Sequence, residues 1–290
     1  MRIKFFQNFI DLLKGKSNYR PLIIYPKMLK KLYSFENKKN CINTLILGSS
    51  HAEYGYRAKK NEINLAISYQ DLYYSCKIYE KMNNENVKNI ILFYSVFSPG
   101  NQLINTQDAY LAIAFKLLFD IEYQDKEYAI RIGLNKLEKK YKNLVSKFAY
   151  NEDYYGNEEE YISYFSNIPP EKRAIPHYKN NQRHNNQTKY IIEMSKLAKK
   201  FNQTIFVVIS PATENYKSLL PSSDVLFSEL YSTVQNLDNV KLINCYDTHF
   251  ENNEFVDWDH LNLKGAERLT NIINSYIAQI RTGTESNIVY

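Results

Sequence analysis

Five short apolar runs, separated by segments of helical periodicity, constrain the fold of this chain more than any other feature. The runs span residues 44–47, 63–67, 89–94, 204–209 and 240–243, and polar residues do not alternate within them. Strands that are buried on both faces have this pattern, because helices cover both sides of a parallel sheet. The helical segments supply the long crossovers that parallel strands need. The sequence therefore predicts an α/β fold with about five parallel strands.

Two of the helical segments carry clear signals. Residues 68–71, Ser-Tyr-Gln-Asp, have the spacing of a capping box, and Leu72, Cys76 and Tyr79 then recur on one face. This pattern predicts a helix that begins close to Ser68. The last segment has apolar residues at helical spacing from about 266 to 280, which predicts a helix that begins just beyond His260 and packs on the sheet.

The stretch from about residue 101 to 186 is too long for a plain connection between strands. Residues 110–119 and 127–148 are predicted to be helical, whereas the polar, proline-containing stretch 151–186 is predicted to be mostly loop. We therefore expect one α/β domain at 41–290 with a largely helical insertion at about 101–186. Residues 1–40 are expected to form a helical or extended segment that packs on this domain, with association to a membrane surface as the alternative.

Composition and charge argue against several classes of protein. The chain is 44% hydrophobic and 23% charged, which excludes intrinsic disorder, and no stretch reaches the ~18 apolar residues of a membrane span. The formal net charge of +6 is scattered, so no nucleic-acid partner is expected. Three widely spaced cysteines predict neither a disulfide framework nor a zinc site and fit a reducing compartment. We expect a cytoplasmic location, with peripheral association at the inner membrane face as an option.

A serine pair follows the first apolar run. A buried strand that stops at Gly48 and turns sharply would present Ser50 at the carboxyl edge of the sheet, where open α/β folds bind ligands. Taken alone, Gly48-Ser49-Ser50 is a weak signal, because small residues also form ordinary turns.

The second motif is the stretch 257–260, Asp-Trp-Asp-His, in the loop between the last run and the last helix. An aspartate three residues before a histidine can accept a hydrogen bond from one imidazole nitrogen while the other nitrogen faces a substrate. Asp259 is the rival to Asp257, but its position next to His260 makes it less able to reach back to the ring. In a parallel sheet this loop and the Ser50 turn emerge at the same edge.

Together, the two motifs resemble those of the SGNH/GDSL hydrolases. Gly48-Ser49-Ser50 is similar to their first block, usually Gly-Asp-Ser, and Asp257-x-x-His260 is similar to their last block. The chain is particularly similar to SGNH-like proteins found with bacterial surface-polysaccharide genes, which carry Gly-Ser-Ser-His-Ala and Asp-x-Asp-His-Leu-Asn. The resemblance covers roughly residues 40–100 and 187–280 and implies a flavodoxin-like three-layer fold.

The resemblance also implies catalytic roles. Ser50 would attack an acyl carbonyl, His260 would take its proton and later return it, and Asp257 would hold the imidazole tautomer. His51 could contact substrate or merely stabilise the turn, and His177 shows no partner in the sequence.

The middle blocks depart from the family pattern. Residues 64–69 lack the family's glycine, so the backbone N–H of Ser68 or Tyr69 is expected to help stabilise the oxyanion together with that of Ser50. Residues 95–101 replace the family's Gly-x-Asn-Asp, and Asn101 is either a shifted oxyanion donor or a turn residue.

These expectations define a leading function and its alternatives. The leading one is a serine-dependent acyl-ester enzyme of surface-glycan or capsule synthesis, a sugar O-acetyltransferase that works through an acyl-serine. An O-acetyl esterase and a non-catalytic glycan-binding or assembly protein are the alternatives, and hydrolysis or transfer of a non-acyl substituent such as a phosphoester is a third. The expected partner is a carbohydrate or a nucleotide-linked or lipid-linked glycan. We expect no metal and no permanently bound cofactor, with acetyl-CoA as a candidate acyl donor.

Overall fold

The computed structural model describes residues 20–145, 168–183, 185–282 and 288–289. The chain divides into two compact units. One comprises residues 1–37 and 102–158, and the other comprises residues 38–101 and 159–290. The larger unit contains the sheet and both sequence motifs, so the candidate site is built within it. The expectation that residues 1–40 pack on the sheet domain stays a prediction.

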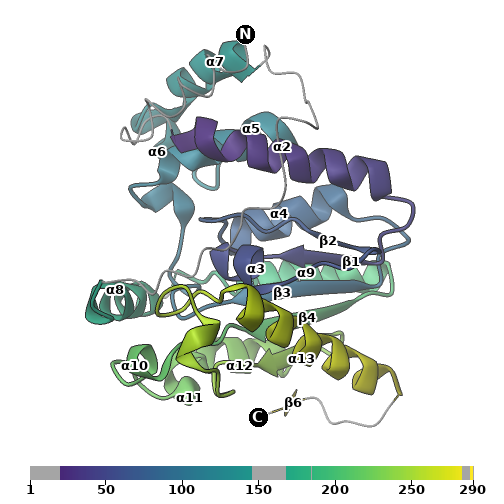
Figure 1. The fold of residues 1–290 in the computed structure, drawn as a ribbon. Coiled ribbons are helices and arrows are strands. Elements are labelled where there is room, and N and C mark those ends of the chain that lie inside the picture. Colours follow the sequence, from purple (N-terminus) through teal and green to yellow (C-terminus); the bar gives the residue numbers. More distant parts are fainter. Residues whose placement is uncertain (1–19, 146–167, 184, 283–287, 290) are drawn as a thin grey trace. The chain divides into compact units, whose positions relative to one another are not determined.

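A parallel sheet forms the centre of the larger unit (Figure 1). Its strand order is β2-β1-β3-β4-β5-β6, and every neighbouring pair is parallel. The strands are β1 Thr44–Leu47, β2 Glu62–Asn64, β3 Asn89–Tyr94, β4 Thr204–Ile209, β5 Val240–Asn244 and the short β6 Ile288–Val289. The predicted five-stranded parallel sheet is confirmed, with β6 as a two-residue addition at one edge. The order of the first five strands is flavodoxin-like, with its topological switch point between β1 and β3.

Helices cover both faces of this sheet. Alternate residues of the strands, such as Ile91 and Phe93 of β3, pack against α3 and α13 in one buried apolar cluster. The opposite face is covered by α4, α9 and α12, so the unit has three layers (Figure 1). The helices of the larger unit are α3 Ser50–Gly55, α4 Leu72–Met82, α8 Glu171–Asn181, α9 Lys189–Lys200, α10 Glu214–Lys217, α11 Ser223–Leu226, α12 Ser228–Val234, the short η5 Asn252–Glu254 and α13 Leu263–Thr282.

Two predicted boundaries next to β2 are wrong by a few residues. The strand ends at Asn64 and not at residue 67. The helix α4 begins at Leu72, and its N-cap is Asp71, whose carboxylate accepts a hydrogen bond from the Tyr74 N–H at 2.9 Å. Ser68 is not part of a capping box, because its hydroxyl donates instead to the Glu53 carboxylate at 2.6 Å. A tertiary partner therefore outcompetes the local one.

The smaller unit is helical, as predicted for the first part of the insertion. It contains α2 Arg20–Lys38 up to residue 37, the short helices η2 Leu103–Asn105 and η3 Ala109–Leu111, and α5 Ala112–Phe119, α6 Lys126–Arg131 and α7 Leu134–Val145. The single helix predicted at 127–148 is two helices, because Gly133 has a φ of +81° and interrupts the helical path. The first 19 residues of the predicted segment 1–40 lie outside the described residues. Among the described residues, no helix is long and apolar enough to cross a membrane.

The prediction of loop over 151–186 is also wrong in part, because residues 171–181 form α8. This helix is attached to the loop that follows β3. The Asn181 amide donates to the backbone carbonyls of Val96 at 2.8 Å and Leu226 at 3.0 Å. Asn185, just beyond the helix, donates to the Gly100 carbonyl at 2.9 Å. These long-range bonds hold the returning chain beside the carboxyl edge of the sheet.

Replacing Gly100 with alanine is expected to lower the free energy of unfolding by about 1 to 3 kcal/mol, because it overpacks the junction with α8. A Cβ atom at Gly100 would lie 1.7 Å from the Asn180 carbonyl oxygen and 2.9 Å from Arg183 Cβ. Gly55→Ala is the matched control, since its nearest contacts would be at an ordinary 3.6 Å. Urea unfolding of the two variants tests this, and equal midpoints for Gly100→Ala and wild type would contradict the tight junction.

Candidate active site

The turn after β1 brings Ser50 to the carboxyl edge of the sheet. Gly48 has a φ of +134°, and a Cβ atom there would lie 2.9 Å from Phe93 Cβ. The chain can turn this sharply against β3 because glycine has no side chain. Ser50 then opens helix α3, next to the topological switch point between β1 and β3 where such sheets bind ligands.

The structure brings the two sequence motifs together. Ser50 Oγ lies 2.7 Å from His260 Nε2, and His260 Nδ1 lies 2.9 Å from Asp257 Oδ2. The His260 backbone N–H also donates to Asp257 Oδ1 at 2.8 Å, which fixes the carboxylate relative to its own loop. With Nδ1–H donating to Asp257, the Nε2 lone pair is directed at the Ser50 hydroxyl. This arrangement can remove a proton from Ser50.

Asp257 is suited to remain an anion. Burial acts to raise the pKa of its carboxyl, but the hydrogen bond from His260 and the charge of Arg173 outweigh burial and keep that pKa below its usual value. The side chains of Asp257 and His260 are 20% and 12% exposed. Both side chains are therefore mostly shielded from water, and each keeps a small exposed part.

Asp259 holds a second histidine instead of competing for the first. His51 Nε2 lies 3.0 Å from Asp259 Oδ2, and His51 Nδ1 lies 3.0 Å from Ser95 Oγ and 3.4 Å from Ser49 Oγ. Burial lowers the pKa of His51, so this imidazole is neutral and donates Nε2–H to the carboxylate. The contacts among Asp259, His51 and Ser95 join the first turn of α3 to two loops at the carboxyl edge. Of the two roles considered for His51, these contacts favour stabilisation of the turn.

Two side chains of α8 complete the group around Asp259. Arg173 Nε donates to Asp259 Oδ1, and its Nη2 lies 3.0 Å from His260 Nδ1. His177 Nδ1 lies 2.8 Å from the Tyr216 hydroxyl and 3.4 Å from Asp259 Oδ2. Although burial opposes ionisation, the charge of Arg173 and the hydrogen bond from His51 hold the pKa of Asp259 well below its usual range.

Sequence reasoning missed Arg173 and left His177 without a partner. Both lie in the stretch predicted as loop, where side-chain directions cannot be assigned. Their spacing of four residues was the available signal, since residues at i and i+4 share one face of a helix. Recognising α8 would have placed a cation and an imidazole on the same face, but not against Asp259.

The structure has different consequences for the expected oxyanion donors Ser68, Tyr69 and Asn101. The Ser68 N–H donates to Glu53 Oε2 at 2.8 Å, so it does not serve as an oxyanion donor in this arrangement. Tyr69 has a φ of +73°, a left-handed conformation that favours glycine, and its side chain is exposed. Strained residues of this kind cluster at functional sites. Asn101 lines a small cavity together with Ser49, and its N–H donates to the Ser98 carbonyl at 3.4 Å, as in a turn. The roles of Tyr69 and Asn101 stay predictions.

Two groups of side chains in the described part of the chain could offer three ligand atoms to a metal ion. Asp257, Asp259 and His260 form one of them, but the Arg173 guanidinium already supplies a cation to both carboxylates. The residues of this group are therefore satisfied without a metal.

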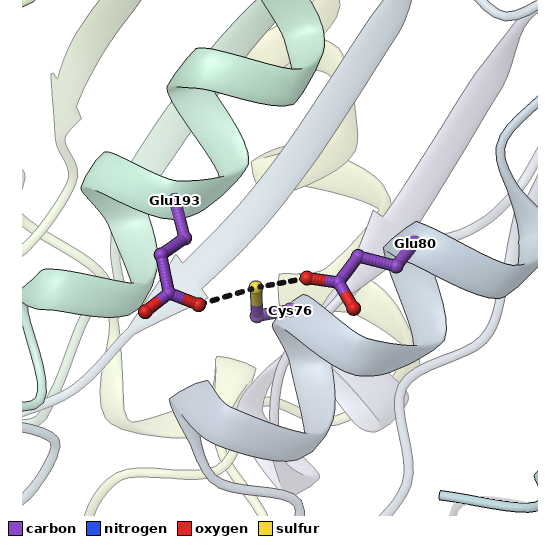
Figure 2. A group of neighbouring side chains, drawn as sticks. All are labelled: Cys76, Glu80 and Glu193. Carbon is purple, nitrogen blue, oxygen red and sulfur yellow. Dashed lines mark hydrogen bonds between the residues drawn. The ribbon is translucent and has the colours of Figure 1, made fainter.

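Figure 2 shows the other group, Cys76 and Glu80 of α4 facing Glu193 of α9. Cys76 Sγ lies 3.7 Å from Glu80 Oε1 and 3.9 Å from Glu193 Oε2. Burial and the two carboxylates raise the pKa of the Cys76 thiol, and Lys77 Nζ lies 2.7 Å from Glu80 Oε1. A protonated thiol is a poor metal ligand, so we interpret this group as a polar contact between two helices.

The buried histidines predict a stability that falls on mild acidification. Burial lowers the pKa of His177 to about 4, whereas an unfolded histidine titrates near pH 6.5. Between these values the unfolded chain binds a proton that the folded chain does not, so stability declines as the pH falls. We expect His177 to contribute a loss of roughly 2 to 3 kcal/mol between pH 6.5 and 4.

Urea unfolding between pH 7 and 4.5 measures this loss. His177→Gln is expected to flatten the pH dependence, whereas His249→Gln, at an exposed position, is the control that leaves it unchanged. Asp257 and Asp259 do not account for the loss of stability between pH 7 and 4.5, because their lowered pKa values affect stability only below about pH 4. Equal stability of the wild type at pH 7 and 4.5 would contradict the buried neutral imidazole.

Comparisons with known proteins leave the family of this chain unassigned. No family model matches the sequence, and no curated protein matches it. Among solved structures, the fold is similar to the crystal structure of a "putative acylhydrolase" from Bacteroides fragilis NCTC 9343, with 12% sequence identity and a TM-score of 0.40. The match covers 82% of this chain and 87% of the other. At this level of similarity the likeness does not extend to activity or substrate.

Proposed function

We propose that this protein is a serine-dependent acyl-ester enzyme of the SGNH type that acts on a bacterial surface glycan. The observation that carries the proposal is the continuous hydrogen-bonded chain from Ser50 Oγ through the His260 ring to Asp257, with contacts of 2.7 and 2.9 Å. Such a chain activates a hydroxyl that is otherwise a weak nucleophile. This arrangement lies at the carboxyl edge of the sheet, where open α/β folds bind ligands.

The proposed reaction has two acyl transfers. In the first, Ser50 Oγ attacks the carbonyl carbon of an acyl donor while His260 Nε2 takes the hydroxyl proton. The tetrahedral intermediate collapses, the bond to the leaving group breaks, and His260 returns the proton to that group. In the second, a hydroxyl gives its proton to His260 and attacks the acyl-serine. The bond between the acyl carbon and Ser50 Oγ then breaks, His260 returns the proton to Ser50, and the new ester is released.

The identity of the second nucleophile decides between transfer and hydrolysis. We propose a sugar hydroxyl as the acceptor and an acetyl thioester such as acetyl-CoA as the donor, which makes the protein a sugar O-acetyltransferase. The resemblance to SGNH-like proteins of surface-polysaccharide gene clusters supports a glycan acceptor. A cytoplasmic location, at the inner membrane face or free, would give access to both the donor and a nucleotide-linked or lipid-linked glycan. Water as the second nucleophile would make it an O-acetyl esterase.

The test follows the mass of a glycan in both directions. The full-length protein is incubated with acetyl-CoA and deacetylated capsular or lipopolysaccharide fragments, and separately with the natively acetylated fragments alone. A gain of acetyl mass that needs Ser50 supports transfer. Loss of acetyl mass from the native glycan, with no gain on the bare one, would assign the esterase reaction. Absence of both, together with glycan binding, would favour the non-catalytic alternative.

A further inference from the structure

Arg173 lies against the imidazole ring of His260. Its Nη2 is 3.0 Å from His260 Nδ1 and 3.3 Å from Nε2, although these atoms already bind Asp257 and Ser50 in the ring plane. A group in the ring plane at these two distances would collide with the Cε1 atom between the nitrogens. The amino group therefore lies over one face of the ring, where a guanidinium stacks favourably.

A buried carboxylate holds the guanidinium in this place. Arg173 Nε donates to Asp259 Oδ1, and Arg173 Nη1 lies 3.9 Å from Asp257 Oδ2. The Asp259 side chain is 4% exposed and is itself fixed by His51 at 3.0 Å. Arg173 comes from α8, which Asn181 ties to the loop after β3. Its position is thus set by buried contacts from two sides, unlike that of a mobile surface arginine.

The charges of the group balance only during the proposed proton transfer. Asp257 and Asp259 are anionic and Arg173 is cationic, so these three side chains together carry one net negative charge. Once His260 has accepted the Ser50 proton, these three side chains and the imidazolium sum to zero, and the negative charge that the transfer leaves lies on the oxyanion of the substrate. Without Arg173, two negative charges would act on His260, which would favour the protonated imidazole before any substrate is bound. A base that is already protonated cannot activate Ser50.

We infer that Arg173 is a positioning residue for the chemistry at Ser50, which it serves by stacking on the His260 ring and offsetting the charge of Asp259. This inference rests on the proposed function, because it requires an activated Ser50. It predicts two separable effects of losing Arg173. The ring loses a fixed orientation, which slows the reaction at every pH, and the acid side of the pH profile moves to higher pH.

The experiment measures the rate at which a fluorophosphonate probe labels Ser50 between pH 5 and 9, so no knowledge of the substrate is needed. For Arg173→Ala we expect a loss of about 10²-fold in rate, as for a misplaced catalytic group. We also expect the acid-side midpoint to rise by about one pH unit. Guanidinium ions at millimolar concentration should restore part of the rate. Lys172→Ala, an exposed neighbour on the same helix, is the matched control and should label like wild type.

Two further variants separate orientation from charge and from folding. Arg173→Lys keeps the charge without the planar group, so its midpoint should match wild type while its rate stays low. If Arg173→Ala fails to fold, Arg173→Ala combined with Asp259→Asn removes both charges. This double variant should also have the wild-type midpoint and a low rate.

Three results would overturn the inference. One is an Arg173→Ala protein that labels at the wild-type rate and midpoint. Another is a slower rate with an unchanged midpoint and no rescue by guanidinium, which would show a role in folding alone. In both cases labelling of the wild type at Ser50 leaves the proposed function standing. A wild type that is not labelled at Ser50 would refute the proposed function, and this inference with it.

Discussion

Replacing Ser50 with alanine is expected to abolish labelling by a fluorophosphonate probe and to lower any esterase or transferase rate by about a thousandfold or more. The reason is that Ser50 Oγ is the hydroxyl placed 2.7 Å from His260 Nε2. Without it, no acyl-serine can form. Mass spectrometry of the labelled peptide and turnover of a chromogenic acetyl ester measure the two effects.

Related variants locate the effect at this group of residues. His260→Ala is expected to cost about as much as Ser50→Ala, because residues that act as a unit have strongly non-additive effects. Asp257→Ala should cost less, since an imidazole can still take a proton without its orienting partner.

Ser49→Ala is the matched control for Ser50→Ala. The Ser49 hydroxyl is buried and lies 3.4 Å from His51 Nδ1, so the variant should keep measurable turnover. Equal turnover in Ser50→Ala and wild type, or a probe adduct on another serine, would remove Ser50 from the reaction.

The second large effect is on stability, at the ion pair between Arg173 and Asp259. Arg173→Met is expected to lower the free energy of unfolding by about 3 kcal/mol or more, because it leaves a buried carboxylate without its cation. Asp259→Asn should cost less, since the Arg173 side chain is 29% exposed and Asp257 lies within 4 Å of it. Urea unfolding at pH 7 provides both values.

The double variant Arg173→Met with Asp259→Asn decides whether the pair is coupled. Its cost should be clearly smaller than the sum of the two single costs, because no uncompensated charge remains. Lys77→Met is a control, as Lys77 forms an exposed ion pair with Glu80, and such pairs contribute only about 0 to 1 kcal/mol. Additive costs for Arg173→Met and Asp259→Asn would show that the contact adds nothing to stability.

Much of the fold could be predicted because its signals are local. The apolar runs at 44–47, 89–94, 204–209 and 240–243 match strands of the structure within one residue, since a strand buried on both faces needs apolar side chains throughout. Because the carboxyl ends of parallel strands lie at one edge of the sheet, the two motifs could be placed together before any contact between them was known. The contact between Asp257 and His260 could also be expected, because the two residues lie three positions apart in one loop.

The predictions that failed concern residues for which a hydrogen-bond partner nearby in the sequence competes with a more distant one. The capping signal at Ser68 was correct in spacing, but the Glu53 carboxylate binds both the N–H and the hydroxyl of Ser68. That contact removes one expected oxyanion donor and moves the helix start to Leu72. A sequence pattern cannot rank two partners when one of them is brought close only by folding.

The sequence by itself determined the parallel sheet, the edge at which Ser50 emerges and the pairing of Asp257 with His260. The tertiary structure decided the surroundings of that group. It pairs Asp259 with His51, buries His177 against Tyr216, and places Arg173 of α8 over the ring of His260. These contacts join segments about 40 to more than 200 residues apart, and the free energy of burying each charge depends on which partners the fold supplies. No local pattern of residues encodes that choice.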